Sequence, residues 1–224
     1  MTPSEQLPMT TLDLFTDEQA SHREQIGPQA FVLRGFALPL ASQLLQAIAV
    51  LQQSSPFRHM VTPGGFTMSV GLTNCGALGW TTDRRDYRYS PNDPLNGQPW
   101  PVMPEVFAQL AREAAAAAGF ENFEPDACLV NRYLPGSKLS LHQDRNERDF
   151  DAPIVSVSLG VNAVFLFGGL ERSDKTAKIP LAHGDIVVWG GVDRMRYHGV
   201  MPIKDTTHPV LGNQRINFTF RKAG

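Results

Sequence analysis

Three residues in the second half of the chain have the types and spacing of a metal site. His142 and Asp144 lie two residues apart in LSLHQDRN, and in an extended strand two such side chains point to one face, roughly 7 Å apart. His198 follows later, in RMRYHGV, just before a glycine. Two imidazoles and one carboxylate form the facial triad of non-heme Fe(II) oxygenases, which leaves positions open for a cosubstrate and oxygen. Taken alone, a His-x-Asp sequence is more often part of a polar strand surface, so the triad needs support from other residues.

The C-terminal strand supplies that support through strict alternation. In residues 215–221 the sequence RINFTFR places apolar side chains on one face and polar ones on the other. The polar face carries Arg215, Asn217, Thr219 and Arg221. One interpretation is an amphipathic strand with a solvated face. The other is a dicarboxylate site, because the planar guanidinium fork matches a carboxylate, and beside an iron triad such a strand fits 2-oxoglutarate.

Two further groups of residues could bind organic ligands. Asn131 and Tyr133 repeat the two-residue spacing in LVNRYLPG, although an edge strand that leads into the Pro-Gly turn would explain them equally well. Trp80, Tyr87 and Tyr89 lie in an irregular region, interleaved with three arginines. Aromatic rings beside arginines suit stacked bases and phosphates, whereas the commoner alternative is a lid that folds its rings onto the core.

Helices come first along the chain and strands afterwards. Residues 40–54 carry apolar side chains at helical spacing and stop before a proline, and residues 104–119 open with a proline and end at a glycine suited to a left-handed cap. Between them, residues 56–103 have the Gly-, Pro- and Asn-rich composition of a functional lid. Residues 126–224 contain eight short strand-like segments, which predicts a sandwich or jelly roll. We therefore expect an α+β, mainly β fold with helices on one side of a β core.

The composition fits a single folded domain, which we expect over residues 31–224. Of the 224 residues, 42% are hydrophobic and 19% are charged, so neither disorder nor a fibrous repeat is indicated. Residues 1–30 are polar and aperiodic, and we interpret them as a poorly determined lead-in. The sequence shows no signal peptide or membrane-spanning run, and its two cysteines suit a reducing compartment, so we expect a cytoplasmic protein.

The charge of the chain is close to balanced, but unevenly distributed. A net charge of −2 argues against a general nucleic-acid binder. Residues 170–224 nevertheless carry 9 basic and 5 acidic groups. If the partner is nucleic acid, we expect modest, salt-sensitive affinity for the strand, with selectivity set in a pocket.

A series of longer motifs, in the order PFRHMVTPGGFTMSV, TNCGALGW, YRYSP, DACLVNRYLPGSKLSLHQD, PIVSVSLG, FLFGGL, HGDIVVWGG, YHGV and RINFTFR, connects these features. Together they resemble the AlkB family of Fe(II)/2-oxoglutarate dioxygenases, which repair alkylated nucleic acid, and most of all its bacterial branch. The resemblance covers about residues 55–221 and includes lid segments that a shared fold alone would not reproduce. It implies a double-stranded β-helix, which is a form of jelly roll.

The resemblance also implies roles for individual residues. The implied iron ligands are His142, Asp144 and His198. The residues implied to bind 2-oxoglutarate are Asn131, Tyr133, Arg215, Asn217 and Arg221, with Arg215 at the distal carboxylate and Arg221 nearer the metal. The residues implied to bind substrate are Trp80, Tyr87, Tyr89, Asn146 and Arg172, with Trp80 stacked on the damaged base and the His142 ring on its other face.

One position departs from the pattern of similar bacterial enzymes. They place an aspartate two residues after the liganding aspartate, near the exocyclic amine of the base, and this chain has Asn146 there. An amide still offers an oxygen acceptor, but its charge is gone. A cationic methylated adenine or cytosine therefore loses one electrostatic partner, and the balance among substrates is expected to change.

The activity implied is oxidative demethylation of N-alkylated bases, of the 1-methyladenine and 3-methylcytosine type, with Fe(II) as cofactor and with 2-oxoglutarate and O2 as cosubstrates. The products are succinate and formaldehyde. The implied partner of a monomeric enzyme is alkylated DNA, preferably single-stranded, with RNA and duplex DNA left open and no membrane involved. Two alternatives are a 2-oxoglutarate oxygenase that acts on a methylated protein or small molecule, and a non-catalytic nucleic-acid binding module.

Overall fold

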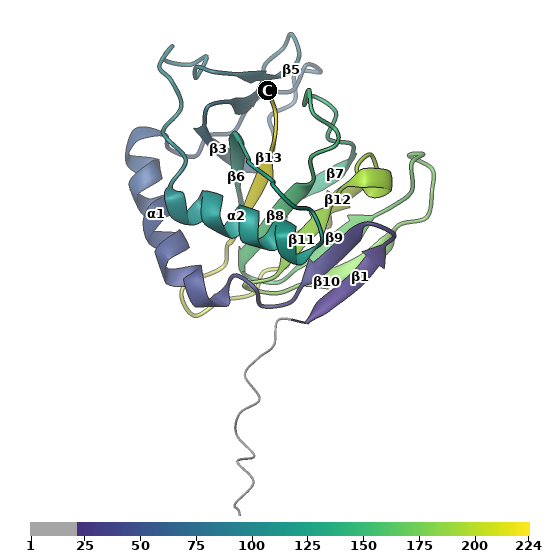
Figure 1. The fold of residues 1–224 in the computed structure, drawn as a ribbon. Coiled ribbons are helices and arrows are strands. Elements are labelled where there is room, and N and C mark those ends of the chain that lie inside the picture. The colour runs from purple at the N-terminus through teal and green to yellow at the C-terminus, as the bar shows by residue number, and fades with distance from the viewer. Residues whose placement is uncertain (1–21) are drawn as a thin grey trace, which may run out of the picture.

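Two antiparallel sheets form the core of the computed structural model, which describes residues 22–224 (Figure 1). The larger sheet has the order β1 (Arg23–Gly27), β2 (Ala30–Leu33), β11 (Ile186–Trp189), β8 (Ile154–Gly160), β13 (Arg215–Arg221), β6 (Ala127–Tyr133), β3 (Gly71–Gly76). The smaller sheet has the order β10 (Ala177–Leu181), β9 (Ala163–Phe167), β12 (His198–Val200), β7 (Leu139–His142). A separate hairpin is formed by β4 (Gly79–Thr82) and β5 (Tyr87–Ser90).

The predicted mainly β fold is confirmed. All eight segments expected after Ala127 are strands, from β6 to β13. Their apolar side chains meet between the two sheets, where Phe165, Phe167 and Trp189 belong to one buried cluster. The arrangement is a jelly roll, and the space between its sheets is filled with side chains except at the cavity described below.

Both predicted helices are present and lie against the outer face of the larger sheet (Figure 1). A 3-10 turn (Leu38–Leu40) leads into α1 (Ala41–Ser54), while α2 (Glu105–Ala117) begins after Pro104. The Phe107 ring of α2 meets the Phe218 ring of β13 edge-on, with centroids 4.7 Å apart. The chain leaves α2 through Gly119, whose φ of +92° belongs to the left-handed region that favours glycine. Burial of such apolar side chains fixes the helices on the sheet, at about 1.5–3 kcal/mol for each large one.

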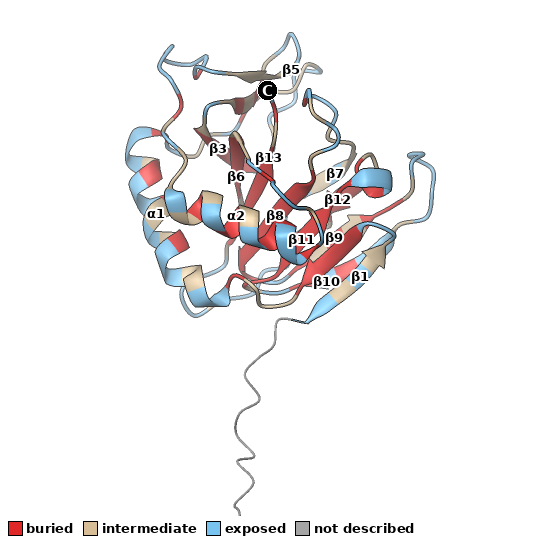
Figure 2. Cartoon of the chain, viewed as in Figure 1, coloured by how far each residue is buried: buried red, intermediate tan, exposed pale blue. Residues whose placement is uncertain are grey.

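Strand β13 runs through the centre of the larger sheet, between β8 and β6. Its apolar residues belong to the cluster shared with the helices, and its polar residues point to the opposite face, toward the smaller sheet. All seven residues of the strand are buried, as the red strands of Figure 2 show. The interpretation of this strand as a surface strand with a solvated face is therefore wrong.

Two segments contain strands that the sequence pattern did not predict. Residues 1–21 of the predicted lead-in lie outside the described residues, but residues 23–27 form β1 at the edge of the larger sheet. Within the predicted lid, residues 71–76 form β3 and pair with β6, so this part of the segment belongs to the core. Of the remainder, Arg58 pairs with Leu72 of β3, while the β4–β5 hairpin carries Trp80 and Tyr87 to the cavity described below. Among residues 22–224, no helix is long and apolar enough to cross a membrane.

A second short 3-10 turn, η2 (Gly191–Asp193), follows β11 and leads the chain toward β12. Its Asp193 side chain is fully buried and accepts a hydrogen bond of 2.7 Å from the main-chain N–H of Gln29. This contact ties the loop before His198 to the turn between β1 and β2. The approach to β12 is thereby fixed, which matters because β12 carries one member of the predicted triad.

Candidate active site

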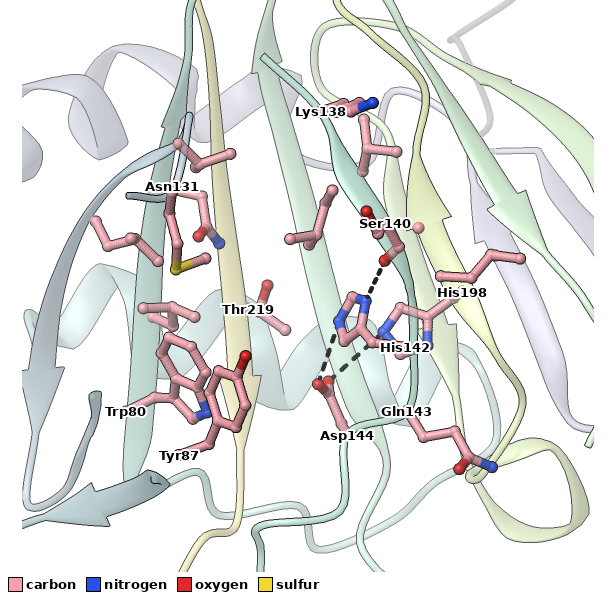
Figure 3. Close-up of a pocket in the computed structure, with 18 of the residues that line it drawn as sticks. Trp80, Tyr87, Asn131, Lys138, Ser140, His142, Gln143, Asp144, His198 and Thr219 are labelled. Carbon is pink, nitrogen blue, oxygen red and sulfur yellow. Dashed lines mark hydrogen bonds and ion pairs between the residues drawn. The ribbon is translucent and has the colours of Figure 1, made fainter. Parts of the chain in front are cut away.

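A cavity of about 1150 Å³ opens between the two sheets and beneath the β4–β5 hairpin. Its floor is built from β6, β13, β7 and β12, and the ring of Trp80 faces it from the hairpin (Figure 3). Twelve of the thirteen predicted site residues line this cavity. The exception is Tyr89, which points its hydroxyl at Glu147 instead.

The three members of the predicted triad meet at one end of the cavity. Strands β7 and β12 pair so that His142 and His198 are directly opposite each other, with ring centroids 4.4 Å apart. The spacing predicted that His142 and Asp144 lie on one extended strand, but β7 ends at His142, and Asp144 lies just beyond it. Its two carboxylate oxygens lie 3.6 Å from His142 Nε2 and 3.8 Å from His198 Nε2 (Figure 3). One ligand atom from each residue falls within 4.8 Å of the others, which is compatible with a shared metal ion.

Hydrogen bonds on the far side of each imidazole prepare the triad for a metal. Nδ1 of His142 lies 2.9 Å from the Ser140 carbonyl, and Nδ1 of His198 lies 3.0 Å from the Arg196 carbonyl. Since a carbonyl accepts only, each Nδ1 carries a proton, and Nε2, which faces Asp144, is the nitrogen of each ring left to bind a metal. Burial and the neighbouring His142 lower the pKa of His198 to about 3. His198 is therefore neutral at physiological pH, as a metal ligand must be.

An arginine on β13 holds the triad carboxylate. Arg221 donates to Asp144 Oδ2 through Nε at 2.9 Å and through Nη2 at 2.7 Å. Burial alone would raise the pKa of Asp144, but the positive charge of Arg221 outweighs it and holds that pKa well below its usual range. The carboxylate is thus ionised and oriented before any ligand binds.

A second arginine lies further along the same face of β13, with unused donors. Arg215 is 2% exposed, and only its Nη2 has a partner, the Ser158 hydroxyl at 2.9 Å. Its Nε and Nη1, together with the hydroxyl of Tyr133, are buried and unpartnered among the described residues. Burial lowers the pKa of Arg215 and raises that of Tyr133. Leaving a buried cation with unpaired donors is costly, so this place suits an anionic ligand with several acceptor oxygens.

Between the two arginines, amide and hydroxyl groups form a polar row. Asn217 lies directly opposite Asn131 in the sheet, and the Asn131 amide donates to Asn217 Oδ1 at 3.4 Å. Asn217 Nδ2 in turn donates to Ser156 Oγ and to the Val157 carbonyl, both at 2.8 Å. The Thr219 hydroxyl also donates to Asn217 Oδ1. These bonds hold in place the polar side chains of the cavity floor, along which a dicarboxylate would lie.

The opposite wall of the cavity is aromatic and more exposed. Trp80 and Tyr87 stack with ring centroids 5.7 Å apart and an angle of 23° between their planes. Tyr87 is 44% exposed. Asn146 and Arg172 are also exposed and lie at the cavity lining, and Asn146 Nδ2 donates to the Tyr87 carbonyl at 3.3 Å. This wall offers a flat surface to a planar ligand.

Three residues that support the site were not predicted. Ser158 could have been found, because Ser156 and Ser158 alternate with apolar residues in PIVSVSLG just as the polar residues of β13 do. Glu147 and Arg194 are buried near Asp144 and form an ion pair at 3.3 Å. They are single charged residues in loops, and nothing in their sequence context distinguishes them from surface residues.

Comparisons with known proteins agree with this geometry. The sequence profile of the 2OG-Fe(II) oxygenase superfamily matches residues 29–221 of this chain. The chain is 60% identical to alpha-ketoglutarate-dependent dioxygenase AlkB of Salmonella typhimurium over 212 residues, which cover 95% of this chain and 98% of that protein. It is 55% identical to the AlkB of Escherichia coli, with the same coverage of both chains. The solved structure of OsALKBH1 superposes with a TM-score of 0.79 at 29% identity, over 90% of this chain and 100% of the other.

Proposed function

The chain belongs to the 2OG-Fe(II) oxygenase superfamily, and from this membership we propose that it removes N-linked methyl groups from bases of nucleic acid, with single-stranded DNA as the preferred form. It is an AlkB-type dioxygenase, with Fe(II) as its cofactor and 2-oxoglutarate and O2 as its cosubstrates. When bound, these groups supply the oxidation of the methyl group, which leaves as formaldehyde while 2-oxoglutarate becomes succinate. The roles proposed below concern the residues of this chain.

His142, Asp144 and His198 are the proposed iron ligands. What supports this is the donor set itself, since the Nε2 atoms of two imidazoles and one ionised carboxylate converge on one point. Such a set leaves further coordination positions for the cosubstrates. The carbonyl groups that hold each Nδ1 proton keep the rings in orientation.

Arg215 and Tyr133 are proposed to bind the distal carboxylate of 2-oxoglutarate. The observation that carries this assignment is the set of buried donors without partners, Arg215 Nε and Nη1 and the Tyr133 hydroxyl. A carboxylate can accept from all of them, which would remove the cost of burying them unpaired. Asn217 is proposed to support this end of the site.

Arg221 and Asn131 are proposed to bind at the end of 2-oxoglutarate that is nearer the metal. Arg221 already bonds Asp144, and its remaining Nη1 is buried without a partner. Its position gives it two tasks, holding the metal carboxylate and offering one donor to the cosubstrate. Asn131 lies opposite Asn217 and lines the same cavity.

Trp80 and Tyr87 are proposed to receive the alkylated base, with the His142 ring on the opposite side of the cavity (Figure 3). An N-methyl group on the Watson-Crick edge is hidden in a duplex, so the base must be extruded, at a cost of a few kcal/mol. Stacking on an aromatic ring returns about 1–3 kcal/mol. Because a single strand does not incur the full cost of extrusion, single-stranded DNA is the proposed partner, bound by a monomer.

Asn146 and Arg172 are proposed to border the base, at the edge that carries its exocyclic groups. Both side chains are exposed and line the cavity. Tyr89 was also predicted to contact substrate, but its hydroxyl bonds Glu147 outside the cavity. We therefore propose for Tyr89 a role in supporting the hairpin rather than in contacting the base.

The alternatives are less well supported. A non-catalytic binding module would have no use for a complete triad with prepared imidazoles. An oxygenase of proteins or small molecules would use the same floor, so the hairpin distinguishes the two possibilities. Stacked Trp80 and Tyr87 rings on a hairpin above the triad favour a base.

The decisive experiment scores demethylation by mass spectrometry across a panel of methylated single-stranded DNA, duplex DNA and RNA oligomers, with Fe(II) and 2-oxoglutarate. For each methyl group removed, we expect the oligomer to lose the mass of one CH2 unit and one succinate to form, fastest on single-stranded DNA. Turnover of methylated peptides without turnover of any oligomer would favour the protein-directed alternative. Faster turnover of RNA than of DNA would overturn the preferred partner alone.

A further inference from the structure

One buried carboxylate near the cavity has no part in the roles assigned so far. Glu147 lies three residues after Asp144 in the chain, and its side chain is 2% exposed. Its Oε1 accepts a hydrogen bond of 2.7 Å from the hydroxyl of Tyr89. Burial raises the pKa of Tyr89 well above 10.0, so the phenol stays protonated and donates. A carboxylate buried this deeply is costly unless other groups balance its charge.

Two arginines balance that charge, and both also contact Asp144. Arg221 Nε lies 3.3 Å from Glu147 Oε1 and 2.9 Å from Asp144 Oδ2. Arg194 Nη2 lies 3.3 Å from Glu147 Oε2, while its Nη1 donates to the main-chain carbonyl of Asp144 at 2.9 Å. Two positive and two negative side chains thus fix the segment that carries the proposed metal carboxylate.

The other partner of Glu147 belongs to the hairpin. Strands β4 and β5 pair only with each other among the described strands, so side chains must fix the hairpin over the cavity. On the β4 side, the Asn74 amide bonds both main-chain groups of Trp80, at 2.9 and 3.0 Å. On the β5 side, Tyr89 bonds Glu147 at 2.7 Å, the exposed Asn146 amide bonds the Tyr87 carbonyl at 3.3 Å, and the buried Trp100 indole bonds the Ser90 carbonyl at 2.9 Å. Of these three, only the bond to Glu147 is charge-assisted, and it is shielded from water, which makes it the strongest.

We propose that Glu147 is a positioning residue that holds the β4–β5 hairpin over the cavity through Tyr89 and orients the Asp144 carboxylate through Arg221. The inference rests on the proposed function, because the hairpin carries the proposed base site and Asp144 is a proposed metal ligand. The contacts of Glu147 with Tyr89 and with Arg221 have different roles. Loss of the Tyr89 hydroxyl releases the hairpin alone, whereas loss of the Glu147 charge leaves two buried arginines beside one carboxylate and disturbs both places.

The test combines Tyr89→Phe, Glu147→Gln and the double variant. Two quantities are measured: the KM for a methylated single-stranded oligomer, and the affinity of the metal-free protein for Mn(II), a probe that needs no turnover. We expect Y89F to raise the oligomer KM about tenfold, as the loss of a charge-assisted hydrogen bond does, without changing Mn(II) affinity. We expect E147Q to raise that KM and also to weaken Mn(II) binding about tenfold, the usual effect of removing support for a metal ligand.

The double variant decides whether the two residues act together. In the Y89F background, E147Q should still weaken Mn(II) binding but should raise the oligomer KM no further. Amide hydrogen exchange of residues 79–90 in the ligand-free protein should be faster in both single variants. Additive effects on KM, or Mn(II) binding by E147Q equal to wild type, would overturn the proposal.

Asp185→Asn is the matched control, because Asp185 is also a buried carboxylate paired with an arginine, Arg34, at 2.7 Å. It does not line the cavity. D185N should lower the melting temperature and leave the oligomer KM and the Mn(II) affinity unchanged. If D185N and E147Q changed these two quantities equally, general destabilisation would explain the effect and the proposal would be overturned. If wild type released no formaldehyde from any methylated oligomer, the proposed function would fail, while the Mn(II) and hydrogen-exchange arms would still test Glu147.

Discussion

The two ends of the cavity are built in different ways. At the end proposed to bind the cosubstrate, the polar side chains are almost fully buried, with Arg215 at 2% and Asn217 at 5% exposure, and neighbouring strands hold them in register. At the end proposed to bind the base, Tyr87 is 44% exposed, and Asn146 and Arg172 are exposed as well. The first end belongs to the core of the sheet, while the second is attached to it by a few side chains.

This difference fits the ligand proposed for each end. A small dianion surrounded by water is recognised only where several donors are already placed and desolvated, because their arrangement then costs nothing at the moment of binding. A base on a long strand must enter and leave, so its wall has to stay accessible. We therefore expect substitutions at the buried end to have the larger effects, and effects on substrate choice to come from the exposed end.

The largest effect should come from the triad. His142→Ala removes one of the three proposed metal ligands, so we expect formaldehyde release to fall by about three orders of magnitude or more, in keeping with the several kcal/mol that a catalytic metal contributes. Formaldehyde is measured at saturating 2-oxoglutarate and oligomer. His208→Ala is the control, since His208 is a half-buried histidine outside the cavity. Equal activity of both variants would remove His142 from the triad.

The next largest effect should come from the buried arginine at the end proposed to bind the cosubstrate. Arg215→Ala deletes donors that have no other partner, and we expect the KM for 2-oxoglutarate to rise about 10- to 100-fold, the range for charge-assisted hydrogen bonds. The KM for the oligomer should stay within about twofold of wild type, since the two ends are separate. Steady-state kinetics with each substrate varied in turn measures both constants. An equal rise in both would mean that the ends are not independent.

Arg215→Lys sharpens the same comparison. It keeps the charge but loses the planar fork, so the KM for 2-oxoglutarate should lie between those of wild type and Arg215→Ala. Arg112→Ala, at a half-buried arginine of α2 outside the cavity, should change neither constant. If Arg215→Lys behaved as wild type, charge alone would explain binding at this end.

The two ends also differ in how far they could be predicted from the sequence. The buried end could be predicted from the alternation of polar and apolar residues in RINFTFR and LVNRYL. Successive side chains of a strand point to opposite faces, so the polar residues of these two buried strands share one face. The hydrogen-bond partners of these residues come from other strands. One example is Ser158, which could be predicted only from the alternation within its own strand. The triad was predictable from residue types, but the meeting of His142 and His198 depends on the pairing of β7 with β12.

At the exposed end, aromatic rings among arginines suggested a place for bases, but the roles of individual residues followed only from the resemblance. Its residues lie in a segment without periodicity, and the strands β3, β4 and β5 within that segment were not predicted. Strand β3 pairs along its whole length with β6, so tertiary pairing rather than local pattern determines it. The contact between Tyr89 and Glu147 joins residues far apart in the chain, and no pattern in the sequence connects them.

A smaller effect is expected at the aromatic wall. Trp80→Ala removes the ring proposed to stack on the base, and the KM for a methylated oligomer should rise about tenfold, since a base on an aromatic ring gains about 1–3 kcal/mol. Trp80→Phe should recover part of the loss. The KM for 2-oxoglutarate should not change in either variant. A rise in the cosubstrate KM would show instead that Trp80 supports the floor of the cavity.

The smallest effect, and the most specific, should come from Asn146→Asp. A carboxylate at this exposed position would attract a cationic base such as 1-methyladenine but not a neutral one such as 3-methylthymine. At about 4 Å in a watery environment the attraction is about 1 kcal/mol, so the ratio of kcat/KM for the cationic base to kcat/KM for the neutral base should rise about fivefold. Loss of the hydrogen bond from Asn146 to the Tyr87 carbonyl should affect both bases alike. The gain should shrink as salt is added, because exposed charges are screened.

Asn213→Asp adds the same charge at an exposed position outside the cavity and therefore separates a local effect from a change in net charge. If N213D produced the same gain, the field of the whole protein would be responsible. Equal gains on both bases in N146D would mean that the new carboxylate acts on the strand rather than on the base. A gain confined to 1-methyladenine and to N146D would place the choice among substrates at the exposed end of the cavity, where the buried triad and arginines have no influence on it.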